Sequence, residues 1–262
     1  MKFFRRLFGA LSLLIALLAV YILFVPTRVL MLGVDSGGLE HTEQGRTDVM
    51  LAMKTRALGA AQLVSIPRDT YAEIPGYGMD KINHAYAYEG PPLTQETTEE
   101  LLGLSLEGYV VVDMTGLTEL VDLVGGIEVT SPDTFVQDDY YFEAGQTAHL
   151  DGRGTLAYVR NRDDTGGDYG RQARQRDVIQ AIFRRVASAS ALSNFSQVAQ
   201  TLNQYVDTNV NIMNLGKLAI QYRLGIGGAN IVQLEGEGTD IDGVYYDIPL
   251  ESSLEEVREI LR

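Results

Sequence analysis

The sequence contains no cysteine, so a disulfide framework, a thiol nucleophile and a cysteine metal site are all excluded. Histidine is scarce: His41, His84 and His149 are scattered along the chain, which leaves a zinc site poorly supported. The patterns G-x-S-x-G, G-x-x-x-x-G-K-[ST] and G-x-G-x-x-G are also missing. The sequence therefore gives no indication of a serine hydrolase elbow or of a glycine-rich nucleotide loop.

One long apolar run is present, from residue 7 to residue 25. It approaches the roughly 20 residues that a helix needs to cross a bilayer. Lys2, Arg5 and Arg6 precede it, so we expect residues 1–6 in the cytoplasm and the chain after Pro26 outside the cell. A cleaved signal peptide is the alternative, but its apolar region is normally shorter and ends in a small-x-small site. We therefore predict an uncleaved signal anchor in the cell membrane.

The chain is acidic, with a formal net charge of -14 over 262 residues. All thirty-five acidic and eighteen of the basic residues follow the apolar run, which gives that part a charge near -17. Nucleic-acid binding is therefore disfavoured. Against this background, six of the twenty-one basic residues fall between Arg153 and Arg176, and all six are arginine. The planar fork of arginine suits phosphate oxygens, so this run predicts a phosphate or pyrophosphate site.

Three apolar stretches near the start of the exported part read as strands, at residues 29–34, 49–53 and 62–66. If they are antiparallel neighbours, the end of the first, the start of the second and the end of the third meet at one sheet edge. The alternative is that the polar residues there are ordinary strand-end residues. The residues collected at this edge are Asp35, Arg46, Asp48, Arg68 and Asp69.

Later segments alternate between helix and strand patterns, which indicates a layered α/β domain. The stretch 135–145 reads as an aromatic and acidic loop. The expected helices cover 94–103, 116–125, 193–205, 215–222 and 252–261, and the expected strands cover 109–114, 127–130 and 231–234.

Two helices frame the arginine run. Asp151 is positioned to cap a first helix that ends before Arg160 and Arg162, although Gly152 and Gly154 weaken this helix. We expect Asp168 to cap the next helix. Its apolar stripe places three polar residues toward the body of the protein, beside unpaired helix amides that favour anions. These residues are Arg171, Arg174 and Gln175.

A pyrophosphate site commonly holds magnesium through one or two protein carboxylates. Asp35 and Asp48 suit that role, and capping of the loop between two strands is their alternative role.

Blocks of sequence in this order resemble the LytR-CpsA-Psr family of envelope phosphotransferases, over nearly everything from Arg28 onward. The matching segments are LMLGVDS, GRTDVMLAM, LVSIPRDTYAEIPG, KINHAYAYEG, YVVVDMTGLTELVDLVGGIEV, FEAGQTAHLDGRGTLAYVRNR, DYGRQARQRDVIQAI and IDGVYYDIPLESSLEEVREIL.

The resemblance implies an extracytoplasmic catalytic domain over residues 28–262, an α/β/α sandwich with a central mixed, largely antiparallel sheet. It also implies a magnesium-dependent transferase that moves a glycopolymer, such as teichoic acid or capsular polysaccharide, from polyprenyl pyrophosphate to a peptidoglycan sugar. The metal pair falls on Asp35 and Asp48. The pyrophosphate-binding residues fall on Arg46, Arg68, Arg160, Arg162, Arg171, Arg174 and Gln175, with Asp168 as an associated aspartate.

For the general base, Asp69 is the first candidate and Asp168 the second, with a purely salt-bridging role as the alternative for both. The family implies an apolar groove for the polyprenyl tail, for which ordinary core is the alternative. The groove candidates are Ile82, Tyr86, Leu117, Leu120, Val121, Leu123, Val124 and Ile182. Arg153 and Arg176 match no family motif and are expected at the surface. A prenyl pyrophosphate hydrolase and a non-enzymatic binder of lipid-linked polymer remain alternative functions, whereas transcriptional attenuation lacks support.

Overall fold

A six-stranded mixed sheet forms the centre of the computed structural model, which describes residues 2–34, 47–161, 167–186, 206–225 and 228–262. The pairs β1–β6 and β3–β12 are parallel, and the other three pairs are antiparallel. The predicted mixed, largely antiparallel sheet is thereby confirmed. Its order is β11 (Val206–Thr208), β6 (Tyr109–Asp113), β1 (Thr27–Val34), β2 (Thr47–Thr55), β3 (Ala61–Ser65) and β12 (Ala229–Gln233).

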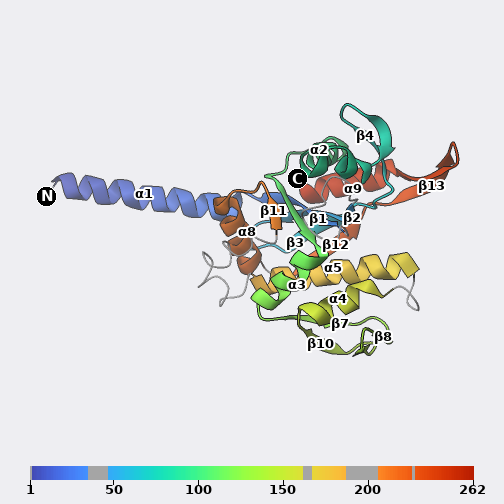
Figure 1. The fold of residues 1–262 in the computed structure, drawn as a ribbon. Helices are drawn as coiled ribbons and strands as arrows, with labels where there is room; N and C mark the ends of the chain where they lie inside the picture. The colour runs from blue at the N-terminus through green and yellow to red at the C-terminus, as the bar shows by residue number, and fades with distance from the viewer. Residues whose placement is uncertain (1, 35–46, 162–166, 187–205, 226–227) are drawn as a thin grey trace.

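Helices cover both faces of this sheet (Figure 1). On one face, α2 (His84–Leu102) and α9 (Glu251–Leu261) pack on a core that includes Leu30, Leu32 and Val34 of β1. On the other face, α5 (Gly167–Val186) and α8 (Ile212–Leu224) pack on Val29 and Met31. Because both faces are covered, β1 is apolar almost continuously instead of alternating. The predicted α/β/α layering is confirmed.

A third hydrophobic cluster lies on the side of α5 away from the central sheet, among the elements that Figure 1 draws below that helix. It joins α5 to α3 (Met114–Leu123), α4 (Gly152–Arg160) and two hairpins. The hairpins are β7 (Ile127–Thr130) with β10 (Thr147–Leu150), and β8 (Phe135–Gln137) with β9 (Tyr140–Phe142). The expected loop over residues 135–145 is therefore wrong. Asp138 and Asp139 adopt positive φ values of 47° and 68°, the two-residue turn geometry that suits a tight hairpin.

Two more hairpins project on the side of the domain away from α1 (Figure 1). They are β4 (Tyr71–Ile74) with β5 (Gly78–Lys81), and β13 (Gly236–Ile241) with β14 (Val244–Pro249). The amide of Asp247 donates to the carbonyl of Asp69 at 2.9 Å, which ties the second hairpin to the base of the first. Sequence patterns did not predict either hairpin.

The N-terminal helix α1 (Lys2–Phe24) extends away from the domain (Figure 1). It is attached where the side-chain amide of Gln221 on α8 donates to the carbonyls of Ile22 and Val25 at 2.8 and 2.6 Å. Within the described residues, no helix reaches the length and apolarity required of a membrane span. The signal anchor at residues 7–25 stays a prediction.

Several predicted helix boundaries were wrong. Helix α2 begins at His84, ten residues before Thr94, and bends at Glu89 and Gly90, whose dihedrals are not helical. Helix α5 begins at Gly167, so Asp168 lies inside its first turn and is not its cap. The expected helix over residues 193–205 lies outside the described part of the chain.

Candidate functional site

The polar edge predicted from the first three strands is present. Val34, the last residue of β1, lies opposite Thr47, the first residue of β2. The backbone amide of Ile66, which follows β3, donates to the carbonyl of Met50 at 3.0 Å. This register brings Arg68 to Asp48, with 2.7 Å between Nη1 and Oδ1. Arg68 Nε also lies 3.6 Å from Oδ2 of Asp69.

Two of the predicted edge residues, Asp35 and Arg46, lie outside the described residues. The described members of the edge are all partly exposed, so a ligand can reach them.

Lys81 extends this set of charges, and sequence reasoning missed it. Its Nζ lies 2.6 Å from Oδ1 of Asp69. The register of the β4–β5 hairpin places Lys81 opposite Tyr71, two residues after Asp69, and no spacing in the sequence reveals that pairing. Asp48, Arg68, Asp69 and Lys81 thus form an alternating chain of ion pairs. Both oxygens of Asp69 face a cation.

Asp247 is a second residue that sequence reasoning missed. Thr70 forms an isolated β-bridge with Asp247, and the backbone amide of Asp247 donates to the carbonyl of Asp69. The β13–β14 hairpin therefore brings a further carboxyl to the site. Burial, and then the charge of Asp69, raise the pKa of the Asp247 carboxyl above its ordinary value.

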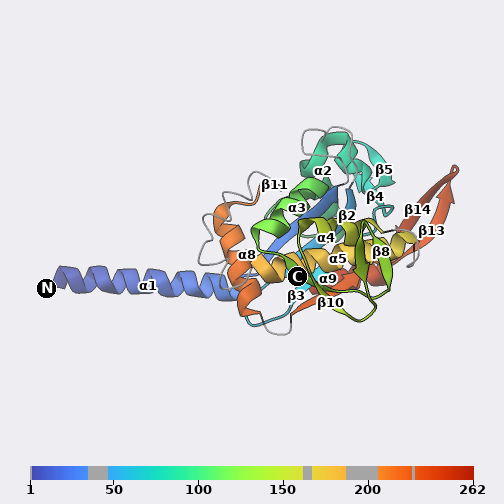
Figure 2. The same ribbon diagram turned by 60° about the horizontal axis from the view of Figure 1, so that its bottom comes forward.

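Arg160 is the last residue of α4 and is exposed. Asp151 caps this helix as predicted, since its side chain accepts from the amide of Gly154 at 2.7 Å. Helix α4 ends and α5 begins on the side of the domain opposite α1, the side on which β1 ends (Figures 1 and 2). Arg162 lies outside the described residues, as do the side chains of Asp168 and Arg171.

Arg174 and Gln175 face the interior, as the apolar stripe of α5 predicted. Arg174 is fully buried, and its guanidinium lies 5.1 Å above the ring of Phe135. Its Nη2 donates to the carbonyl of Asn161 at 2.6 Å. Burial lowers the pKa of the Arg174 guanidinium, which nevertheless stays protonated. In this structure Arg174 supports the backbone beside Arg160, a different role from the predicted pyrophosphate contact.

The two arginines expected at the surface differ from each other. Arg153 is exposed, whereas Arg176 is only partly exposed, with its Nη1 3.4 Å from Oε1 of Gln233 on β12 in an exposed hydrogen bond.

Magnesium binding at this edge depends on the carboxylate ligands available there. The described residues hold no group of three or more histidine or carboxylate side chains that could form a complete metal cage. Asp48 is a partly exposed carboxylate beside an arginine, which fits the one or two carboxylates that magnesium uses when phosphate supplies further oxygens.

The predicted lipid-groove residues divide between two clusters. Ile82 and Tyr86 belong to the core under α2 and α9. Five further predicted groove residues belong to the cluster around α3 and α5. That second set comprises Leu117, Leu120, Val121, Val124 and Ile182. Leu123, the remaining one, is half-buried.

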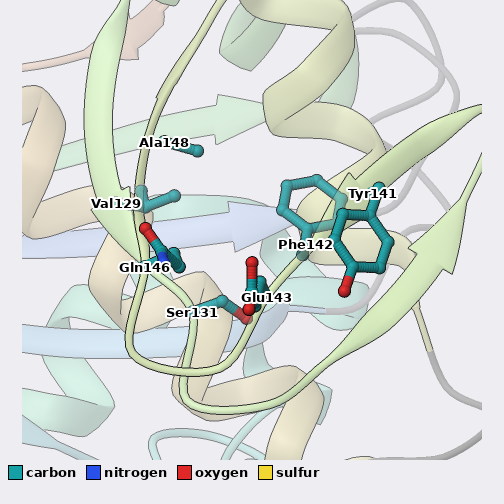
Figure 3. A pocket seen from close by; sticks show the side chains of 7 residues that line it. All are labelled: Val129, Ser131, Tyr141, Phe142, Glu143, Gln146 and Ala148. Atoms are coloured by element: carbon teal, nitrogen blue, oxygen red, sulfur yellow. The ribbon is translucent and has the colours of Figure 1, made fainter.

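A pocket of about 160 Å³ lies between β9 and the β7–β10 hairpin (Figure 3). Val129, Tyr141, Phe142 and Gln146 are among its lining residues, and none of the predicted groove residues reaches it.

The sequence that forms this fold and site matches the model of a known protein family. The model of the LytR_cpsA_psr family matches residues 25–262, which covers the sheet, the ion-pair chain and α5. The chain belongs to the LytR_cpsA_psr family. The resemblance noted in the sequence is thereby confirmed.

A relative from Enterococcus faecalis, named polyisoprenyl-teichoic acid–peptidoglycan teichoic acid transferase TagU, is 41% identical over 240 residues. The match covers 90% of this chain and 79% of the relative.

Two solved structures share the fold. Bacillus subtilis TagV matches with a TM-score of 0.75 at 30% identity, over 90% of this chain and 95% of TagV. A structure of TagT bound to LIIa-WTA matches with a TM-score of 0.71 at 29% identity, over 90% of this chain and 89% of TagT.

Proposed function

We propose that this protein is a membrane-anchored phosphotransferase. It moves a glycopolymer of the teichoic acid or capsular type from polyprenyl pyrophosphate to a hydroxyl of a peptidoglycan sugar, and forms a phosphodiester. The observation that carries the proposal is the partly exposed ion-pair chain at one sheet edge, on the side where α4 delivers Arg160 and α5 begins. The name of the Enterococcus faecalis relative supports the polymer and the acceptor.

The charges of the site suit a pyrophosphate. Arg68 and Arg160 are positioned to neutralise its oxygens, and we place Arg46, Arg162 and Arg171 in the same role. Asp35 and Asp48 are the residues that would hold magnesium, which when bound adds positive charge at the phosphate oxygens. Arg68 is held by Asp48 and Asp69 before the substrate arrives, so its guanidinium needs little reordering.

The reaction forms one bond and breaks one. The oxygen of the sugar hydroxyl attacks the phosphorus nearer the glycopolymer, and the bond from that phosphorus to the bridging oxygen breaks. Polyprenyl phosphate leaves with the bonding electrons, and the hydroxyl proton goes to a base. Positioning and charge stabilisation by the arginines supply most of the rate enhancement.

The base is a carboxylate of this edge. Asp69 and Asp168 are the candidates from sequence, but Asp69 faces Lys81 and Arg68, which favours its salt-bridging role. Asp247 has a raised pKa, which brings a carboxylate closer to the basicity needed near neutral pH. The pH–rate profiles of Asp69→Asn, Asp168→Asn and Asp247→Asn decide among the three: the base is the residue whose replacement removes the acidic limb.

Helix α1 supports membrane anchoring. Its side chains Leu13, Leu14 and Leu17 are each more than half exposed, an arrangement that water disfavours and lipid favours. The candidate site lies at the opposite end of β1 from α1, about 23 Å away at the usual rise of a strand. The polyprenyl tail therefore needs an apolar path along the domain, for which the residues around α3 remain our candidates.

Transfer of labelled glycopolymer from a polyprenyl pyrophosphate donor to peptidoglycan fragments tests the proposal. We expect transfer by the wild type and a loss of at least about 100-fold in Asp48→Ala and Arg160→Ala, since Arg160 supplies positive charge to the reacting phosphate and Asp48 would hold the magnesium that adds more. Arg153→Ala is the matched control, because it removes an exposed arginine from the same helix.

The outcomes separate the alternatives. Release of polyprenyl phosphate without an acceptor product identifies a hydrolase, and binding without release, with or without magnesium, identifies a carrier protein. Normal transfer by both alanine variants contradicts the site.

A further inference from the structure

A cluster of tyrosines continues the ion-pair chain away from the phosphate site. The tyrosine surface consists of Tyr71, Tyr77, Tyr88 and Tyr246, from β4, the β4–β5 turn, α2 and β14. Tyr77 and Tyr88 stack with ring centroids 4.4 Å apart, and Tyr71 meets Tyr246 edge to face at 4.8 Å. Tyr77 is 49% exposed and Tyr88 is 42% exposed. Two aromatic rings are thus fixed in place and remain open to solvent.

Asp80 holds this surface together. Its Oδ2 accepts from the Tyr88 hydroxyl at 2.6 Å and lies 2.8 Å from Nδ1 of His84, while its Oδ1 lies 3.5 Å from the Tyr246 hydroxyl. The Tyr77 hydroxyl donates to Glu89 at 3.0 Å. The bond to Asp80 raises the pKa of Tyr88 to about 12, so this hydroxyl stays a donor at neutral pH. These hydrogen bonds hold the hydroxyl edges of the rings, and because Tyr77 and Tyr88 stack on each other, only the outward face of each ring can meet a ligand.

The tyrosine surface is joined to the phosphate site. Lys81 pairs with Asp69 and also lies 5.7 Å from the Tyr246 ring. Asp80 is the next residue along β5, and on α2 His84 and Tyr88 lie one turn apart. A ligand lying across these rings therefore extends to the edge that holds Arg68.

The chemistry of this surface fits a sugar chain. A pyranose presents a face of C–H groups to an aromatic ring and hydroxyls at its rim, so it matches exposed rings surrounded by carboxylate and imidazole acceptors. The nearby surface also carries exposed acids, including Glu73, Glu89 and Asp242, which repel a phosphate-rich polymer. The charge therefore favours an uncharged glycan over the anionic polymer that is transferred.

We propose that the tyrosine surface binds the acceptor glycan strand and directs one of its hydroxyls toward the phosphate bound at Arg68. This inference rests on the proposed transferase function and adds the acceptor-binding site to it. Tyr77 and Tyr88 supply the stacking faces, and Asp80 is a positioning residue that fixes Tyr88.

Direct binding tests the inference without catalysis. The full chain in detergent is titrated calorimetrically with a tetrasaccharide of β-1,4-linked N-acetylglucosamine, and with the glucose tetrasaccharide that lacks acetamido groups. We expect saturable binding of the first, weakened about tenfold or more in Tyr77→Ala/Tyr88→Ala. Tyr77→Phe keeps the ring and should bind within about twofold of wild type, on the same scale. Tyr141→Ala removes a 64% exposed tyrosine elsewhere and is the matched control.

A second arm measures turnover. In the transfer assay, Tyr77→Ala/Tyr88→Ala should raise the KM for the acceptor about tenfold. Release of polyprenyl phosphate to water should not change, because the arginines are intact. Loss of glycan binding in Tyr141→Ala to the same extent, or no binding by the wild type, overturns the inference, as does self-association of the chain that Tyr77→Ala abolishes. If the wild type binds the glycan but never turns over the donor, the proposed transferase function fails and the glycan site stands.

Discussion

Replacing Arg174 by methionine tests whether this buried residue supports the site. The charged hydrogen bond to the Asn161 carbonyl is worth about 1.5–3 kcal/mol, and the contact with the Phe135 ring adds about 0.5–2 kcal/mol. Methionine restores most of the lost packing. The variant also no longer buries a charge, and removing that desolvation penalty offsets several kcal/mol of the lost interactions. We therefore expect the free energy of unfolding to fall by only about 1–3 kcal/mol, which leaves a folded protein.

The effect on activity should be larger than the effect on stability. Arg174 holds the backbone next to Arg160, and a displacement of about 1 Å in a charged group near the reacting phosphate costs up to about 100-fold in rate. Urea unfolding followed by circular dichroism measures the first quantity, and donor turnover measures the second. Phe135→Leu is the control, since it removes the ring and keeps the hydrogen bond. A folded Arg174→Met protein with wild-type turnover refutes the supporting role.

The remaining predictions concern stability. Gly152→Ala should destabilise the fold by about 2 kcal/mol, because the new Cβ would lie 2.4 Å from the carbonyl oxygen of Thr118 on α3. Helix propensity alone predicts a gain of about 1 kcal/mol, so a stabilised variant in thermal unfolding contradicts the packing argument. For Asp80, partial burial alone would raise the pKa, but hydrogen bonds from Tyr88 and His84 hold it below its ordinary value. The contribution of ionised Asp80 to stability is therefore fully present above its pKa in the unfolded chain, about 4. It is lost as the pH falls through the lower pKa of Asp80 in the folded protein. The stability difference between wild type and Asp80→Asn, measured by urea titration, should be constant at neutral pH and shrink below about pH 4; an unchanged difference at pH 2 contradicts the assignment.

Much of the fold could be predicted from local patterns. The strands β1, β2 and β3 are continuous apolar runs bounded by polar residues, and the short link between the second and third indicated a hairpin. Helix α4 was predicted from its Asp151 cap, and the inward face of α5 from its apolar stripe. In each case the signal is a repeat or a cap within a few residues, which depends only on backbone geometry.

Some of the elements that were missed are very short. β8 and β9 have three residues each, too few for a periodic pattern, and their turn depends on two aspartates at positive φ. Gly152 weakened the prediction of α4 because glycine has a low helix propensity. In the folded protein glycine is required at this position because α3 approaches it too closely for a side chain.

For the site, local patterns were enough to identify an arginine run in an acidic chain, a polar strand edge and the ordered motifs of one family. Which of these residues meet depends on contacts between elements that are distant in sequence. The hairpin registers bring Lys81 and Asp247 to Asp69, and the contacts of Arg174 with Phe135 and with the Asn161 carbonyl make this inward-facing residue a buried support instead of the predicted pyrophosphate ligand. Local patterns specify which face of an element is buried, whereas contacts between elements depend on the registers and loop geometries that join them.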